Sequence, residues 1–346
     1  MSPSTSQVSN TRVLIAKIPE GVAPNNTHFE TVTQVEDVPV LKENEIFVKN
    51  IIFSMEPYIR LDDFTETTRQ SRVVGYAIAK VLESKNQAFP VGSTVFSSSE
   101  WGQYSHIHLP QYLKDVTRID EIIDPSLPIS VYNGVLGVGG FTSWDSLEKI
   151  GNLKAGETIY ISSAAGTLGQ LAGQLSKRKG LRVIGSAGTD AKVQFLLNDL
   201  GFDAAFNYKT QDKRQALTEA VGPAGLDIYY DLIGDVTVEI ALDLMNPHGR
   251  VLAVGLLAWH QNARPHVPTN MINILYKQLR YEGYTVFDRH EFFPQFLQEI
   301  GPLVADGSIK YTDTVVEAGV EALGETYVDL LGGKYTGKVS VQIAEF

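Results

Sequence analysis

Residues 157–169 read ETIYISSAAGTLG, an apolar stretch followed by a turn of small residues. The apolar part, residues 157–162, is typical of a buried β-strand. Residues 167–179 (TLGQLAGQLSKRK) have helical spacing and a basic last turn, which complements a helix dipole. The turn between them follows the pattern A-x-G-x-x-G, which differs from the phosphate-binding pattern G-x-G-x-x-G only in Ala164.

In this pattern Gly166 would let a pyrophosphate approach the backbone, and Gly169 would let the helix pack close to the strand. Phosphates would then lie at the positive end of the helix. The motif alone is also compatible with a tight strand-to-helix turn that binds nothing. Its position after a strand, before a helix and at the start of a strand–helix array favours a dinucleotide site.

The array continues to residue 287 with the same alternation. We expect strands at 182–185, 204–208, 226–232, 249–255 and 281–287, and helices at 190–200, 212–221, 236–245 and 271–279. Apolar strands alternating with helices predict a parallel sheet covered on both faces, which is the Rossmann doubly wound fold of the α/β class.

The first third of the chain has a different pattern. Between about residues 11 and 127, short strand-like segments such as 45–53, 73–82 and 93–96 are separated by Gly, Pro and Asn. This pattern predicts a second, mostly β domain. Residues 1–10 are rich in Ser and Thr, and we expect them to form a disordered tail without a secretory signal.

Composition excludes several classes of function. The 346 residues carry a net charge of −11, which disfavours nucleic-acid binding, and no apolar run approaches the ~20 residues of a membrane span. The chain has no cysteine, so disulfides and thiolate metal sites are excluded, and we expect a cytoplasmic protein.

The end of the second strand bears on the choice of coenzyme. An NAD site would place Asp or Glu there, but residues 185–192 read GSAGTDAK. Ser186 and Lys192 would attract the 2′-phosphate of NADPH. We expect Asp190 to lie at the helix start and to face away, and Lys192 has the alternative of being an ordinary solvated lysine.

Two histidines are close in sequence. His106 and His108 would point to one face of a strand, where a metal ion is conceivable. A surface pair without metal is the favoured interpretation, so no metal site is predicted. Without cysteine, the usual zinc site of alcohol dehydrogenases cannot form.

Several further motifs occur in order along the chain. They are SMEPYIR at 54–60, WGQY at 101–104, LGFDAAFNYKT at 200–210, NPHG at 246–249 and GK at 337–338. With them the sequence resembles the zinc-independent branch of the medium-chain dehydrogenase/reductase family, which includes prostaglandin reductases, plant alkenal double-bond reductases and bacterial curcumin reductase. The resemblance covers nearly the whole chain.

This resemblance implies hydride transfer from NADPH to the β-carbon of a small hydrophobic α,β-unsaturated ketone or aldehyde, by a homodimer. It implies a GroES-like catalytic domain over 11–130 and 306–346, and a coenzyme domain over 131–305. The residues expected to bind coenzyme are Gly166, Thr167, Leu168, Gly169, Gln170, Ser186, Lys192, Tyr208, Gly255, Leu257, Tyr284, Val286 and Tyr335.

Three positions depart from the family pattern. Leu232 stands where the family has an Asn that binds coenzyme. His260 stands where the family has a Tyr credited with proton donation, and Tyr335 stands where it has a second Asn that contacts coenzyme. Reduction of an enone leaves an enolate that needs a hydrogen-bond donor and a proton. Tyr58 and His260 are the candidate catalytic residues, with solvent as a third source of the proton.

Other functions remain open at this point. The same hydride chemistry would serve a quinone reductase or a zinc-free alcohol dehydrogenase. The three departures are also compatible with an NADPH-binding protein that has lost catalysis.

Overall fold

The computed structural model describes residues 6–19, 23–57, 59, 72–108, 116–258, 266–286 and 288–346. The chain divides into two compact units. The first contains residues 1–133, 314–335 and 339–346, and the second contains residues 134–313 and 336–338.

The second unit is built on a six-stranded sheet in which all described pairs are parallel. Its order is β10-β9-β8-β11-β12-β13, which confirms the Rossmann prediction. The strand order reverses between β8 and β11, where such folds bind their ligands. The strands are β8 (Thr158–Ile161), β9 (Arg182–Ala187), β10 (Ala204–Asn207), β11 (Leu226–Asp231), β12 (Met245–Ala253) and β13 (Arg280–Gly283).

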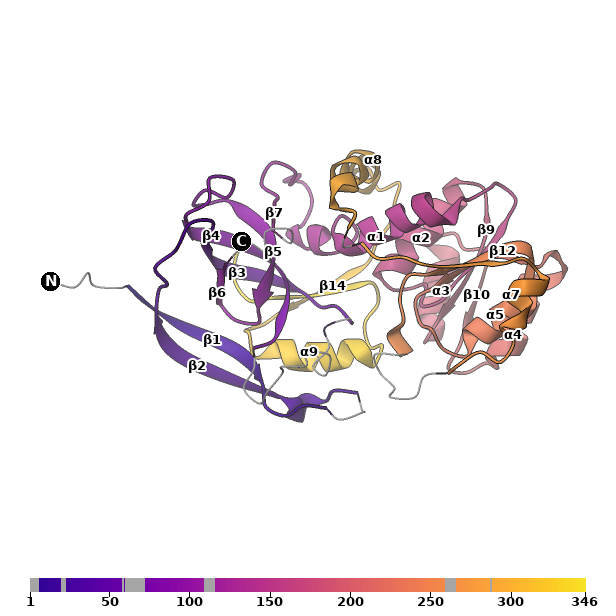
Figure 1. Ribbon diagram of the computed structural model, residues 1–346, viewed down its shortest axis with the longest axis horizontal. Helices are drawn as coiled ribbons and strands as arrows, with labels where there is room; N and C mark the ends of the chain where they lie inside the picture. Colours follow the sequence, from indigo (N-terminus) through magenta and orange to yellow (C-terminus); the bar gives the residue numbers. More distant parts are fainter. Residues whose placement is uncertain are drawn as a thin grey trace. The chain divides into compact units, whose positions relative to one another are not determined.

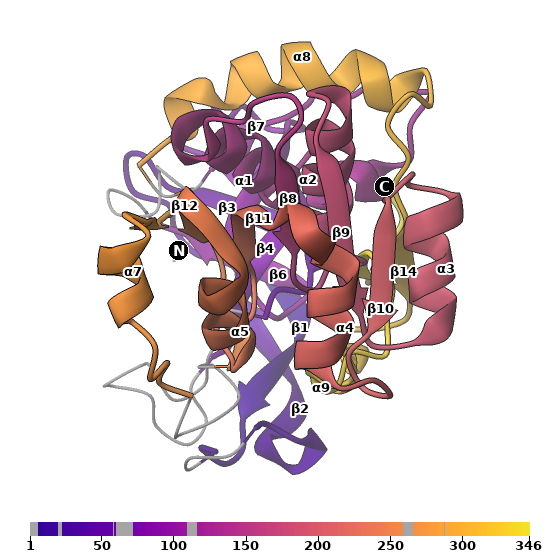
Figure 2. The same cartoon turned by 90° about the vertical axis from the view of Figure 1, so that its right-hand side faces the viewer.

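Helices cover both faces of this sheet (Figure 2). Ile159 and Ile161 of β8 belong to a core with α2 and α3, whereas Tyr160 between them belongs to the core with α4 and α5. This division follows from the alternation of side chains along a strand. The helices are α1 (Val138–Ser146), α2 (Thr167–Arg178), α3 (Asp190–Asn198), α4 (Lys213–Val221), α5 (Thr237–Leu244), α7 (Ile272–Tyr276) and α8 (Phe293–Ala305).

Both units also contain short helical turns. They are η1 (Asn26–His28), η3 (Ile129–Asn133), the π-helical η4 (Leu147–Gly151), η5 (Gly222–Ala224) and η6 (His290–Phe292).

The first unit is mostly β, as the sequence predicts (Figure 1). One antiparallel ribbon joins β1 (Gln7–Ile15) to β2 (Phe29–Asp37). A second sheet has the order β14-β15-β3-β4-β5-β7, with β6 paired to β3. Its strands are β3 (Ile46–Ser54), β4 (Val74–Ser84), β5 (Thr94–Glu100), β6 (Tyr104–Ile107), β7 (Thr117–Arg118), β14 (Asp313–Glu317) and β15 (Lys338–Gln342), and α9 (Ala322–Leu331) packs beside them.

One local expectation needs correction. Residues 7–10, which were expected to be disordered, form the start of β1, where Gln7 pairs with Asp37 of β2. The expectation that Asp190 lies at a helix start is confirmed, because Asp190 is in the first turn of α3, where a negative charge is favourable. The side chain of Thr189 caps this helix by accepting from the backbone N–H of Lys192.

The backbone of α2 packs closely against the backbone of the turn after β8. A Cβ placed on Gly169 would lie 2.5 Å from the Cα of Ala164. Only glycine allows this approach, as the motif predicts, and it brings the start of α2 to the carboxyl end of β8.

We therefore predict that Gly169→Ala lowers the free energy of unfolding by about 2–3 kcal/mol, because the added methyl group forces helix and turn apart. Chemical denaturation without coenzyme measures the change. Gly283→Ala is the matched control, since a Cβ there meets nothing within 4 Å. Equal stability of the two variants would contradict the close-packing argument.

Candidate functional site

The turn between β8 and α2 leaves an open helix end. Gly166 is the N-cap of α2 and no side chain caps the helix. A Cβ on Gly166 would meet only Ser163 within 4 Å, with the carbonyl oxygen at 3.3 Å. The backbone N–H groups of Thr167 and Leu168 lie in the first turn, which is the usual place for an anion to bind.

Gln170 has a structural task in this region. Its side chain is buried, and its Nε2 donates to the carbonyl of Ala165 at 3.0 Å. Its Oε1 accepts from the backbone N–H of Thr312 at 3.0 Å. The N–H of Gly337 donates to the same Ala165 carbonyl at 2.9 Å. Gln170, predicted to contact the pyrophosphate, therefore fastens the turn to the segment at Thr312, and Gly337 bonds to the turn directly.

A basic group of side chains lies at the ends of β9 and β10. Lys192 is half-buried in the first turn of α3, and burial and the charge of Lys209 lower its pKa. A Cβ on Gly188 would lie 3.1 Å from the Oη of Tyr208 and 3.2 Å from the Cε of Lys209. The phenol of Tyr208 and the side chain of Lys209 thus lie close to Gly188, and the charge of Lys209 acts on Lys192.

Asp190 and Ser186 are turned to other partners. The Oδ1 of Asp190 accepts from the Nδ2 of Asn207 at 2.7 Å, which accounts for the acid beside a site expected to bind phosphate. Ser186 is buried, and its hydroxyl hydrogen-bonds the Oη of Tyr160 at 2.8 Å. The hydroxyl expected to attract a 2′-phosphate is therefore engaged in the core.

Lys209 is absent from the set that the sequence predicted. The register pairs Asn207 of β10 with Ala187 of β9, so the residues after Asn207 follow beside Gly188. A lysine two residues beyond a strand end was the available signal, but it becomes informative only when the neighbouring strand is known.

The turns after β11 and β12 touch each other. A Cβ on Gly255 would lie 3.0 Å from the carbonyl oxygen of Leu232, and the N–H of Leu257 donates to that oxygen at 3.4 Å. The N–H of Leu232 donates to the hydroxyl of Ser162 at 2.9 Å. The segments after β8, β11 and β12 are thus linked at one edge of the sheet, near which the nicotinamide is expected.

A buried carboxylate shapes the turn that carries Leu232. The Oδ1 of Asp231 accepts from the Tyr229 hydroxyl at 2.7 Å and from the N–H groups of Ile233 and Gly234 at 2.9 and 3.0 Å. Burial raises the pKa of Asp231. Its Oδ2 is buried and has no partner among the described residues.

Tyr284 is likewise held by a buried acid. Its hydroxyl donates to the Oδ2 of Asp145 at 2.7 Å, and both oxygens of Asp145 also accept from Arg289, at 2.9 and 3.0 Å. Burial, together with the hydrogen bond to Asp145, raises the pKa of Tyr284. Val286 lies buried between these two anchors. Tyr284 therefore fixes the course of the segment expected to line the nicotinamide.

The remaining expected residues are less closely defined. Tyr58 and His260 lie outside the described residues. Tyr335 belongs to the first unit, is half-buried, and donates its hydroxyl to the Oδ2 of Asp329 at 3.3 Å.

Comparison with known proteins adds evidence over the full length. A family described as "Zinc-binding dehydrogenase" matches residues 167–301, and one described as "N-terminal domain of oxidoreductase" matches residues 11–114. The chain is 32% identical over 346 residues to the tobacco (Nicotiana tabacum) protein named 2-alkenal reductase (NADP(+)-dependent), covering 98% of each. It is 31% identical over 324 residues to (+)-pulegone reductase of Mentha piperita, covering 91% and 93%.

A solved structure resembles the chain equally completely. CurA from Vibrio vulnificus, in complex with NADPH, has a TM-score of 0.85 and 28% identity, covering 97% of this chain and 100% of that one. The similarity therefore extends over both units of the chain. The chain belongs to the zinc-independent branch of the medium-chain dehydrogenase/reductase family, the branch of alkenal, prostaglandin and curcumin reductases.

Proposed function

We propose that this protein transfers a hydride from NADPH to the carbon–carbon double bond of an α,β-unsaturated ketone or aldehyde, without a catalytic zinc ion. The observation that carries the proposal is the 32% identity, over 98% of both chains, to a 2-alkenal reductase that uses NADP(+). The name of (+)-pulegone reductase, a second relative of similar coverage, supports reduction of a small hydrophobic substrate.

The described residues fit NADPH in three places. The backbone of Gly166 to Gly169 would hold the pyrophosphate at the open end of α2. Lys192, Lys209 and Tyr208 would bind the 2′-phosphate through charge-assisted hydrogen bonds. Gly255 and Leu257 would lie beside the nicotinamide, on an edge braced by Leu232. When bound, NADPH supplies the hydride.

The protein must then stabilise the oxygen of the enolate and deliver a proton. Tyr58 is proposed as the donor to the substrate oxygen and His260 as the acid, because imidazole titrates near neutral pH. Comparing the turnover of Tyr58→Phe with that of His260→Phe separates these roles. Full activity of both variants would assign the proton to solvent.

A homodimer is proposed as the assembly. Strand β13 is an edge of the parallel sheet, and the neighbouring α7 exposes Ile272, Leu275 and Tyr276 at 51%, 69% and 74%. Edge strands and apolar patches of this kind are covered when two copies meet around a two-fold axis.

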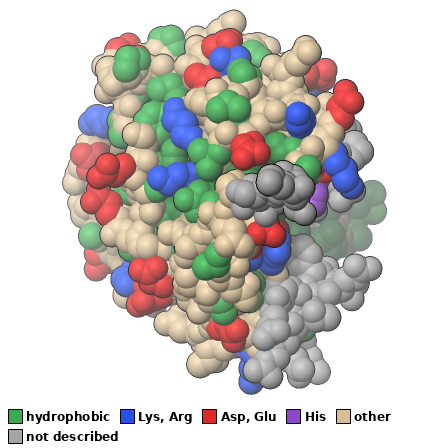
Figure 3. Space-filling view, turned by 90° about the vertical axis from the view of Figure 1, so that its left-hand side faces the viewer, with side chains coloured by type: hydrophobic (Ala, Val, Ile, Leu, Met, Phe, Trp, Pro, Cys, Tyr) green, Lys and Arg blue, Asp and Glu red, His purple; other side chains and the backbone are tan. Residues whose placement is uncertain are grey.

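The charge distribution on the described surface is consistent with an enzyme that acts on small molecules. Figure 3 shows acidic and basic side chains interspersed on the described part of one face, without the continuous basic surface that nucleic acid needs.

Within the described ranges, no helix has both the length and the apolar character needed to span a bilayer. We propose a cytoplasmic location, with which a chain lacking cysteine is compatible.

The reaction is tested by following NADPH oxidation against enones, enals and quinones, with NADH in parallel. We expect turnover of enones or enals with NADPH and much slower turnover with NADH. Turnover of quinones alone would replace the proposal with a quinone reductase. Tight NADPH binding without turnover on the whole panel would indicate a protein that has lost catalysis.

The 2′-phosphate site makes a sharper prediction. Lys192→Ala and Lys209→Ala should each weaken NADPH binding by about 10- to 100-fold, the value of a charge-assisted hydrogen bond, and leave NADH binding nearly unchanged. Lys179→Ala is the control, since this exposed lysine pairs with Glu148 instead. Equal losses for the two coenzymes would contradict the assignment. Binding is measured by coenzyme fluorescence titration.

The dimer is tested by charge at the exposed helix. Leu275→Asp should convert the assembly to monomers in light scattering coupled to size exclusion, because a buried unpaired carboxylate is costly. Val40→Asp, at a residue 83% exposed in the first unit, should leave it unchanged. A dimer that survives Leu275→Asp would place the interface elsewhere.

A further inference from the structure

The pairing of β3 with β6 brings three metal-ligating side chains to one face of the first unit. The register pairs Ile46 with Ile107 and Phe47 with His106, so Glu45 and His108 come next in the same antiparallel alignment. Because alternate residues of a strand share a face, Glu45, His106 and His108 point to the same side.

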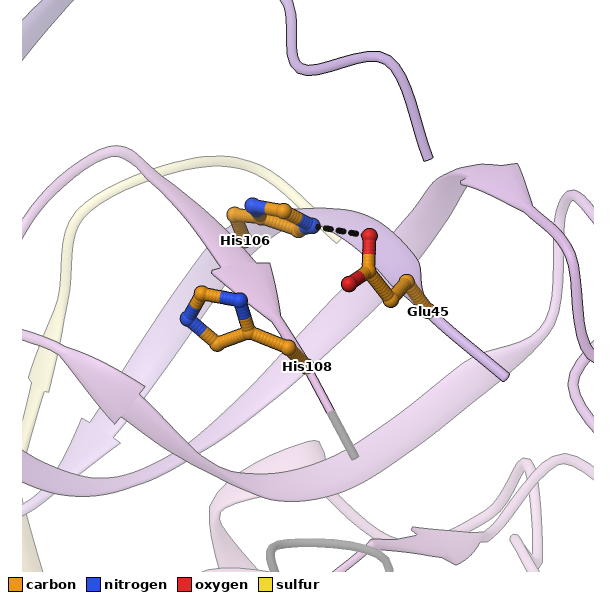
Figure 4. A group of neighbouring side chains, drawn as sticks. All are labelled: Glu45, His106 and His108. Atoms are coloured by element: carbon orange, nitrogen blue, oxygen red, sulfur yellow. Dashed lines mark hydrogen bonds and ion pairs between the residues drawn. The ribbon is translucent and has the colours of Figure 1, made fainter. Parts of the chain in front are cut away.

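The distances between these groups are short (Figure 4). The Nε2 of His106 lies 3.0 Å from the Oε2 of Glu45, and the rings of His106 and His108 are 4.5 Å apart between centroids. One ligand atom from each residue lies within 4.8 Å of the other two. Ligand atoms around a tetrahedral zinc ion are about 3.3 Å apart, so small rotations of the side chains would complete the geometry.

The carboxylate of this group is well oriented. Glu45 is buried, and its Oε2 also accepts from the backbone N–H of Lys42 at 2.8 Å. Its Oε1 has no hydrogen-bond partner in the described part of the chain. Partners that orient a ligating carboxylate are a regular part of metal sites. His106 is half-buried and His108 exposed, which leaves an approach for an ion.

We propose that Glu45, His106 and His108 bind one divalent transition-metal ion of the zinc class. Two imidazole nitrogens and a carboxylate oxygen suit Zn²⁺ or Co²⁺, whereas Mg²⁺ and Ca²⁺ take oxygen ligands. Three protein ligands leave a fourth position for water or a small anion. The site belongs to the first unit and contains none of the residues expected to bind coenzyme.

Such an ion would act on the fold rather than on hydride transfer. It would join the beginning of β3 to the residue after β6 and stabilise the folded state in proportion to the free metal concentration. The protein contains an internal comparison. His266 and Glu239 form a similar ion pair at 2.7 Å, but no second imidazole is grouped with them among the described residues.

The experiment uses untagged full-length protein treated with a chelator and then titrated with ZnCl₂ in a calorimeter. We expect one equivalent of Zn²⁺ to bind, and a Co²⁺ titration to give the intense visible absorption of a tetrahedral site. His108→Gln and Glu45→Gln should each weaken Zn²⁺ binding by about 100-fold or more, because losing a ligand costs at least as much as losing a partner that orients one. His266→Gln should bind Zn²⁺ as the parent does.

Melting temperatures measured without metal establish that each variant is folded, and exposed His108 is the safer substitution if Glu45→Gln is not. The absence of Zn²⁺ binding by the parent protein would overturn the proposal. So would equal Zn²⁺ affinities of parent and His108→Gln, because the ion would then lie elsewhere.

Discussion

The second unit depends on one close contact between backbones, where α2 meets the turn after β8 and residue 169 has no side chain. This approach aligns the start of the helix with the point where the strand order reverses. Gln174 then attaches α2 to the backbone of Lys310 through both its amide nitrogen and its amide oxygen, and the amide oxygen of Gln170 accepts from the backbone N–H of Thr312. The open end of the helix is thus held by bonds that do not compete with an anion for the first-turn N–H groups.

Buried carboxylates shape the rest of the same edge. Asp231 organises the turn after β11, and Asp145 holds Tyr284 and Arg289 beyond β13. Removing a charged group from water is costly unless hydrogen bonds replace the lost solvation. Both acids collect several donors, so the loops near the expected nicotinamide are defined by polar anchors, and the glycine at 255 keeps the neighbouring turns in contact.

Local pattern was sufficient to predict the alternating elements and the role of Gly169, because these depend on neighbours within a few residues. The parallel sheet followed from the alternation of apolar strands with helices, although its pairs join remote strands. The partners of Gln170, Ser186 and Tyr284 could not be predicted in the same way. Their hydrogen bonds reach Thr312, Tyr160 and Asp145, which are remote in sequence. The contribution of Lys209 depends on the neighbouring strand, and that of Glu45 to the histidine pair depends on strand register. The family resemblance predicted which positions bind coenzyme. It did not predict which of their side chains form hydrogen bonds within the protein itself.

Residues 336–338 follow a segment of the first unit and belong to the second, where they meet the turn after β8. Gly337 has a φ of +70°, and a Cβ there would lie 1.6 Å from the carbonyl oxygen of Thr312. Its N–H donates to the carbonyl oxygen of Ala165, and the N–H of Lys338 donates to the carbonyl oxygen of Thr312. The second unit therefore does not consist of one contiguous stretch of sequence. A chimera that exchanged only residues 134–313 with a relative would pair the new turn with a foreign closing tripeptide, so the two segments are expected to diverge together during evolution.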